Sequence, residues 1–261
     1  MQWAVNNGII QKLFINNKNI IKPWGFETSD SFSFYSLETG GNNNEVIRST
    51  VKTTENINEI RKIIKMKEGK WVLDIWEELD NSNQQIIRRH KLEVLEDSFM
   101  FDYVVRFRFK KKFIKKAIIN NLEINHKGSN IYYQYPVDSV RLIGEDFDIE
   151  ISVIESRLAD KFSLYMYVRD FKDEWIVHAR FMPKVWDKEV LKLCVWWYNK
   201  ALPQKFADLL LKLPKVRQKI WLRSEQKPYK FPLTLLNPNS YPEVLLNKGD
   251  RLSLTTKFKL L

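Results

Sequence analysis

The chain has 261 residues, enough for one large domain or for one domain with an appendage. Hydrophobic residues make up 44% of it and charged residues 29%, whereas Gly (8) and Pro (9) are scarce. This balance excludes collagen-like repeats, low-complexity linkers and intrinsic disorder. With 43 Lys and Arg against 32 Asp and Glu, the net charge is +11, which favours an anionic partner.

Cysteine content and the first residues bear on the compartment. A single cysteine, Cys194, cannot form an internal disulfide. Residues 1–10 lack the basic and apolar regions of a signal peptide. The sequence also contains no uninterrupted run of about 18 apolar residues, which a membrane-spanning helix would need. We therefore expect a soluble, intracellular protein of the cytoplasm without membrane insertion.

Apolar residues recur mostly at every second position from Gln2 to about Trp186, which is the spacing of a half-buried strand. The clearest case is 101–109, where aromatic and Val residues occupy the odd positions. Arg106 and Arg108 occupy the other face. We expect this strand to have one core face and one basic face.

Further strands follow the same alternation. The stretch 146–155 has an acidic outer face, and the runs 162–169 and 175–181 flank a short polar stretch, which predicts a hairpin. Weaker patterns predict strands at 31–37, 46–53, 60–66, 71–77, 86–95, 118–124, 131–137 and 252–261. So many short strands predict an all-β sandwich, jelly roll or barrel, with an α+β fold as the alternative.

The pattern changes at Asp187, a potential helix N-cap. Apolar residues near helical spacing then favour a short helical segment from 187 to about 225, followed by a Pro-containing extended tail. We expect a β-rich body over 1–186 and a segment over 187–261 that packs on the same domain, because no Ser/Gly-rich linker separates them.

The stretch 106–116 (RFRFKKKFIKK) interleaves aromatic and basic residues. Such composition supplies phosphate contacts and stacking surfaces for nucleic acid. An anion-binding surface would use Arg106, Arg108, Lys110, Lys112 and Lys115. The alternative is a charge ladder in which acidic 146–150 pairs with the basic strand and only stabilises the sheet.

Titratable residues give a weaker indication of chemistry. The candidates for acid–base catalysis are Glu123, His126, Asp148 and His178, chosen because histidine titrates near neutrality and carboxylates could converge with it. None of the three histidines has a metal-ligand spacing, and no nucleotide or nucleophile-elbow motif is present. We expect no metal and no cofactor.

A polar and aromatic stretch at 129–137 (SNIYYQYPV) suggests a small-ligand site. The amide groups of Asn130 and Gln134 and the phenol of Tyr132 could form hydrogen bonds to a hydroxyl-rich ligand such as a glycan. The tyrosine ring would cover the apolar side of that ligand. An ordinary amphipathic strand explains the same pattern through β-propensity.

Three functions follow, in order of preference. The first is a non-enzymatic protein whose basic sheet face binds an anionic polymer, with nucleic acid as the preferred partner. The second is a carbohydrate-binding or carbohydrate-processing β-sandwich. The third is a structural jelly-roll subunit whose charges set subunit contacts. The sequence leaves the oligomeric state open.

Overall fold

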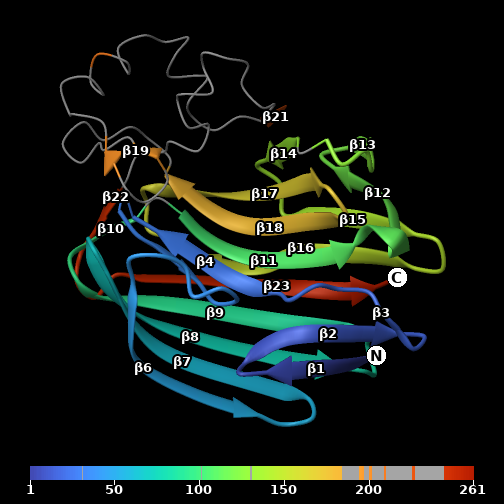
Figure 1. The fold of residues 1–261 in the computed structure, drawn as a ribbon, viewed down its shortest axis with the longest axis horizontal. Coiled ribbons are helices and arrows are strands. Elements are labelled where there is room, and N and C mark those ends of the chain that lie inside the picture. The colour runs from blue at the N-terminus through green and yellow to red at the C-terminus, as the bar shows by residue number, and fades with distance from the viewer. Residues whose placement is uncertain are drawn as a thin grey trace.

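Two large antiparallel sheets form the body of the protein in a computed structural model (Figure 1). The described residues are 1–30, 32–100, 102–129, 131–183, 194–196, 200–201, 209, 225–226 and 244–261. Core side chains from both sheets form one hydrophobic cluster. The all-β prediction is confirmed.

The first large sheet has seven strands in the order β21-β14-β17-β18-β11-β4-β5. Its strands are β4 (Gly25–Ser29), β5 (Phe34–Ser36), β11 (Asp102–Lys110), β14 (Tyr132–Tyr135), β17 (Phe162–Phe171), β18 (Glu174–Pro183) and β21 (Glu225–Gln226). The predicted hairpin is present as β17 and β18.

The second large sheet has nine strands in the order β13-β12-β15-β16-β23-β9-β8-β7-β6. Its strands are β6 (Glu45–Thr53), β7 (Ile57–Met66), β8 (Gly69–Asp80), β9 (Gln85–Glu96), β12 (Ile114–Ile119), β13 (Leu122–Asn125), β15 (Ser139–Gly144), β16 (Asp148–Arg157) and β23 (Arg251–Leu260). The red β23 of Figure 1 lies between β16 and β9, so the last strand of the chain occupies the middle of this sheet.

Smaller elements complete the described structure. The strands β1 (Gln2–Asn6), β2 (Ile9–Ile15) and β3 (Lys18–Asn19) form a separate sheet. Two further pairs are β10 (Ser98–Met100) with β22 (Val244–Leu246), and β19 (Cys194–Trp196) with β20 (Lys200–Ala201). A 3₁₀ turn, η1 (Lys111–Phe113), connects β11 to β12. No helix of the described residues is long and apolar enough to cross a membrane.

Strand β11 shows how the alternating sequence builds the sandwich. The side chains of Tyr103, Val105, Phe107 and Phe109 are completely buried in the core between the sheets. Phe107 packs edge-on against the ring of Trp24, with 4.9 Å between the ring centroids. The alternate side chains of β11 consequently lie on the outer face of the seven-stranded sheet.

Two sequence predictions need correction. The strand expected at 118–124 is a hairpin, because Asn120 and Asn121 have φ angles of 48° and 63°, the left-handed conformation of a tight turn between β12 and β13. Within the helical segment expected at 187–225, Cys194–Trp196 and Lys200–Ala201 pair as strands. Val and Trp in the first of these favour extended backbone. Most of the expected segment lies outside the described residues.

Candidate functional site

The outer face of the seven-stranded sheet carries a cluster of polar and charged side chains, which we call the polar face. Strand register assembles it, since Arg106 of β11 lies opposite His178 of β18 on one side and Gly25 of β4 on the other. Two residues before Arg106, Val104 lies opposite Arg180 of β18 on one side and opposite Glu27 of β4 on the other. The polar face consists of Glu27, Asp102, Arg106, Gln134, Tyr167, His178 and Arg180, and Glu38 reaches it from the segment after β5.

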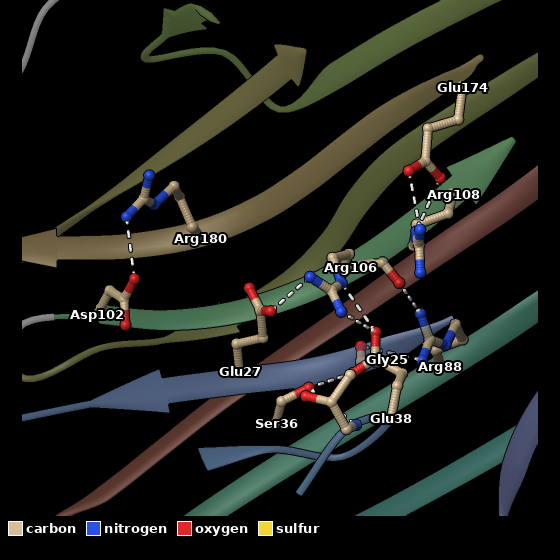
Figure 2. Close-up of polar contacts among 11 residues, drawn as sticks. Gly25, Glu27, Ser36, Glu38, Arg88, Asp102, Arg106, Arg108, Glu174 and Arg180 are labelled. Carbon is tan, nitrogen blue, oxygen red and sulfur yellow. Dashed lines mark hydrogen bonds and ion pairs between the residues drawn. The ribbon is translucent and has the colours of Figure 1, made fainter. Parts of the chain in front are cut away.

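Arg106 occupies the centre of the polar face between two glutamates (Figure 2). Its Nη1 lies 2.5 Å from Oε1 of Glu27, and its Nη2 lies 2.6 Å from Oε1 of Glu38. The Arg106 side chain is 15% exposed and the two glutamates are 13% and 4% exposed. The backbone carbonyl of Arg106 accepts a hydrogen bond from Arg88, so the inner and outer faces of the strand are both anchored.

Gly25 allows Glu38 to reach this arginine. A Cβ atom at Gly25 would lie 1.6 Å from Cδ of Glu38, so any larger residue would displace the glutamate. Ser36 also orients Glu38, because its hydroxyl donates to Oε2 at 3.0 Å. The absence of a side chain at Gly25 therefore allows the segment after β5 to approach β4 closely.

A second ion pair lies at the end of the polar face. Nη2 of Arg180 lies 3.1 Å from Oδ2 of Asp102, and Ser29 donates to Oδ1 of the same aspartate at 2.7 Å. Nη1 of Arg180 donates to Oε1 of Gln134 at 3.2 Å. These contacts hold the amide of Gln134 with its Nε2 facing away from the arginine, and this buried Nε2 has no hydrogen-bond partner among the described residues.

Burial and charge shift the pKa values of this cluster in opposite directions. Burial raises the pKa of Glu27 to about 7, although Arg106 opposes the change. Burial and then the neighbouring arginines, first Arg106 and Arg180, hold the pKa of His178 well below its usual range. The polar face therefore has a carboxyl on β4 that gains and loses a proton near neutral pH, and a neutral imidazole on β18.

His178 packs against Tyr167 on the polar face. Its ring lies 4.5 Å from the ring of Tyr167, measured between centroids. The buried Nε2 of His178 accepts from and donates to no group of the described residues. A buried polar atom without a partner is unfavourable unless another molecule satisfies it.

The basic strip expected at 106–116 is interrupted. Arg106 is neutralised as above, and Arg108 donates two hydrogen bonds of 2.8 Å to the buried Glu174. Lys110 donates to the backbone carbonyl of Asn19. The turn η1 then carries the chain from the seven-stranded sheet to the nine-stranded sheet, so Lys112 and Lys115 do not continue the face of β11.

The predicted charge ladder between the acidic stretch 146–150 and the basic strand is not formed, because β16 belongs to the nine-stranded sheet and does not adjoin β11. Its Asp148 pairs instead with Arg141 at 2.6 Å. The acidic partners of the basic strand come from β4, β18 and the segment after β5. Strand register brings these partners to β11, and the local sequence does not indicate them.

The remaining predicted catalytic residues do not converge. Glu123 forms an exposed ion pair with Lys116 at 2.8 Å. His126 lies 3.2 Å from Asp170, whose carboxylate also accepts three backbone N–H groups from 127–129. These contacts anchor a loop, and only His178 of the four candidates belongs to the polar face.

Two of the three residues of the predicted ligand-binding stretch are described by the structure. Asn130 lies outside the described residues. The backbone of Tyr132 pairs with Arg169 and Gln226, and Gln134 belongs to the polar face. Sequence reasoning missed Glu27, Glu38 and the carboxylate of Asp102. The alternation along β11 indicated that Asp102 shares a face with Arg106, whereas no strand was predicted around Glu27.

Comparisons with known proteins support the fold. No family model and no curated protein matches this sequence. Among solved structures, a galactose mutarotase-related enzyme from Lactobacillus acidophilus is 9% identical with a TM-score of 0.50, covering 100% of this chain and 97% of that chain. A galactose mutarotase-like protein from Lactobacillus casei is 8% identical with a TM-score of 0.50, covering 99% and 96%. A candidate aldose 1-epimerase from Escherichia coli K12 is 5% identical with a TM-score of 0.50, covering 98% and 93%.

These similarities and the polar face correct the preferred functional prediction. The chain has the β-sandwich fold of galactose mutarotase-like proteins, and its neighbours in structure are carbohydrate-related. Buried glutamates neutralise Arg106 and Arg108, which were expected to contact phosphates. The prediction of a nucleic-acid-binding basic sheet face is wrong.

Proposed function

We propose that this protein processes a carbohydrate on the polar face, by transferring protons at the anomeric centre of an aldose. The observation that carries the proposal is that the two strands flanking β11 place a Glu27 carboxyl with a pKa of about 7 and a neutral His178 on the same sheet face, on either side of Arg106 and Val104. The structural neighbours, a galactose mutarotase-related enzyme and a candidate aldose 1-epimerase, supply the substrate class.

Interconversion of sugar anomers needs one proton donor and one proton acceptor. The bond from C1 to the ring oxygen breaks while the ring oxygen gains a proton and the C1 hydroxyl loses one, which gives an open-chain aldehyde. Rotation about the bond from C1 to C2 and ring closure in reverse then yield the other anomer. Glu27 in its acid form is suited to protonate the ring oxygen, because its pKa is about 7. The unprotonated imidazole of His178 would hold the hydroxyl proton only transiently, because its lowered pKa favours returning that proton when the ring closes.

Other groups of the polar face suit sugar binding. The Nε2 atoms of Gln134 and His178 have no hydrogen-bond partner among the described residues, so each has hydrogen-bonding capacity for a sugar hydroxyl that reaches it. The ring of Tyr167 offers an apolar surface beside His178.

An NMR exchange experiment tests the proposal. Anomeric proton signals of galactose and glucose are followed with and without the protein, and we expect faster exchange between the two anomers of at least one sugar. Glu27→Gln should slow the catalysed exchange by about 100-fold or more, since general acid–base groups contribute about 10²–10⁴-fold. The rate should fall above pH 7 as Glu27 ionises.

The matched control is Glu123→Gln, which alters an exposed glutamate outside the polar face and should leave the exchange rate unchanged. Sugar binding without accelerated exchange would replace the enzyme with a carbohydrate-binding protein. If a panel of aldoses shows neither binding nor exchange, the proposal is overturned.

A further inference from the structure

A groove crosses the outer face of the nine-stranded sheet, over β6, β7, β8 and β9, and has a volume of about 470 Å³. The two large sheets pack through their inner faces, so this groove lies on the opposite side of the sandwich from the polar face. Its volume falls within the range of small-molecule pockets, about 300–1,000 Å³. The lining includes Lys52, Glu59, Arg61, Trp76, Arg89 and Lys91.

Strand register builds the groove from two rows of side chains. Lys52, Glu59, Trp76 and Arg89 lie opposite one another on successive strands. Arg61 and Lys91 lie in the neighbouring row on either side of Asp74. The groove thus lies on four paired strands, which suits a fixed arrangement of its side chains.

The guanidinium of Arg89 lies over the indole ring of Trp76, with 4.3 Å between Cζ and the ring centroid. Stacking on an aromatic ring restricts a guanidinium to one plane and leaves the N–H groups at its edge available. An arginine held this way is prepared to donate two parallel hydrogen bonds to a carboxylate or phosphate.

The charges of the groove are unequal and only partly paired. Arg61 donates to both carboxylate oxygens of Asp74 at 3.0 and 3.1 Å. The lining holds four cations and two carboxylates, which gives it a net charge of +2. Lys52, Arg89 and Lys91 form no ion pair within the described part of the chain. Glu59 also has no ion-pair partner there, and its carboxylate would repel a second anionic group while accepting hydrogen bonds from hydroxyls.

We propose that the groove is a second ligand site, which binds a small hydroxylated molecule bearing one anionic group, a phosphate or a carboxylate. Arg89, supported by Trp76, grips the anionic group together with the ammonium groups of Lys91 and Lys52. Glu59 accepts hydrogen bonds from the hydroxylated part and disfavours chains with repeated charges. This site is independent of the polar face and of the chemistry proposed there.

The experiment titrates the full chain with glucose 6-phosphate, glucuronate, glucose and inorganic phosphate by calorimetry. The indole N–H signal of Trp76, identified by its loss in Trp76→Phe, is followed by NMR. We expect glucose 6-phosphate or glucuronate to bind and to shift this signal, and whichever binds identifies the anionic group. Arg89→Gln should weaken the binding at least tenfold.

Two controls separate this site from others. Lys65→Gln removes an exposed cation of β7 outside the groove and should leave binding unchanged. Glu27→Gln should also leave the Trp76 shift unchanged, so failure of the polar-face proposal does not affect the result. Equal affinity for glucose, equal affinity for inorganic phosphate, or a Trp76 signal that no probe shifts would overturn the proposal.

Discussion

Buried ion pairs are the main residue-scale feature of this sandwich. Arg106 is shared by two glutamates on the polar face, and Arg88 pairs with Glu77 inside the core at 2.6 Å with both side chains almost fully buried. Removing charges from water is costly, and only close partners and further hydrogen bonds offset that cost. Asn58 supplies one of these by donating to Glu77 at 2.7 Å. The direction in which the pKa of each buried group shifts then depends on its neighbours.

Glu27 should give the stability of the protein a specific dependence on pH. Its pKa is about 7 in the folded chain and near 4.5 in an unfolded one, so between these values the folded state holds more protons. The contribution of Glu27 to the free energy of unfolding therefore falls as pH rises from about 4.5 to 7, by at most about 1.4 kcal/mol per pH unit. Urea denaturation of the wild type and Glu27→Gln across this range should show the slope only in the wild type.

His178 provides the contrast, because its lowered pKa has the opposite sign. The unfolded chain binds a proton at this histidine below about pH 6.5 and the folded chain does not, so its contribution to stability is lost as pH falls. His178→Gln should remove this acid-side loss and leave the Glu27 slope. Parallel pH profiles for the wild type and Glu27→Gln would contradict the shifted pKa of Glu27.

At the scale of elements, neighbouring strands depend on each other through single positions. Strand β4 has no side chain at Gly25, where Glu38 crosses it to reach Arg106. Tight turns act similarly, since Asn16 with Asn17 and Asn120 with Asn121 adopt positive φ angles and set the register of their hairpins.

A double-mutant cycle tests the contact between β4 and Glu38. Gly25→Ala should lower the free energy of unfolding by about 1.5–3 kcal/mol, the contribution of hydrogen bonds to a charged group, because the new methyl displaces the Glu38 carboxylate. In a Glu38→Ala background the same change should cost much less, as measured by urea denaturation. Additive losses would show that Gly25 is needed for a reason other than Glu38.

At the scale of the whole molecule, the last strand of the chain completes a sheet whose other strands come from residues 45–157. Strand β23 lies in the middle of the nine-stranded sheet, and its Leu252, Leu254 and Phe258 are completely buried. Without it, β16 and β9 would each expose an unpaired edge. That the segment 187–261 packs with 1–186 as one domain stays a prediction.

Removing the last strands tests this dependence. A chain that ends at residue 243 loses β22 and β23, and we expect it to aggregate or to show no cooperative thermal transition. A chain that lacks only Leu261, which is 53% exposed, should melt close to the full-length protein. Cooperative melting of the shorter chain as a soluble monomer would show that β16 and β9 do not need β23.

Much of the local structure was predictable from sequence. The alternation of 101–109 predicted which side chains of β11 enter the core, and the same rule predicted the β17–β18 hairpin. The hairpin at Asn120 and Asn121 was missed, although two adjacent asparagines between apolar runs favour a tight turn. The cluster at β4 was missed because its strand is short and its alternation is weak.

The sequence by itself determined the all-β class and the face on which Arg106 and Arg108 lie, because the side-chain period of a strand is a local property of the backbone. Only the tertiary structure decided what these residues meet. Glu38 lies 68 residues from Arg106 in the chain, and Glu174 lies 66 residues from Arg108. Pairing between distant strands brings those carboxylates to the arginines, and burial then sets the charge that each group carries.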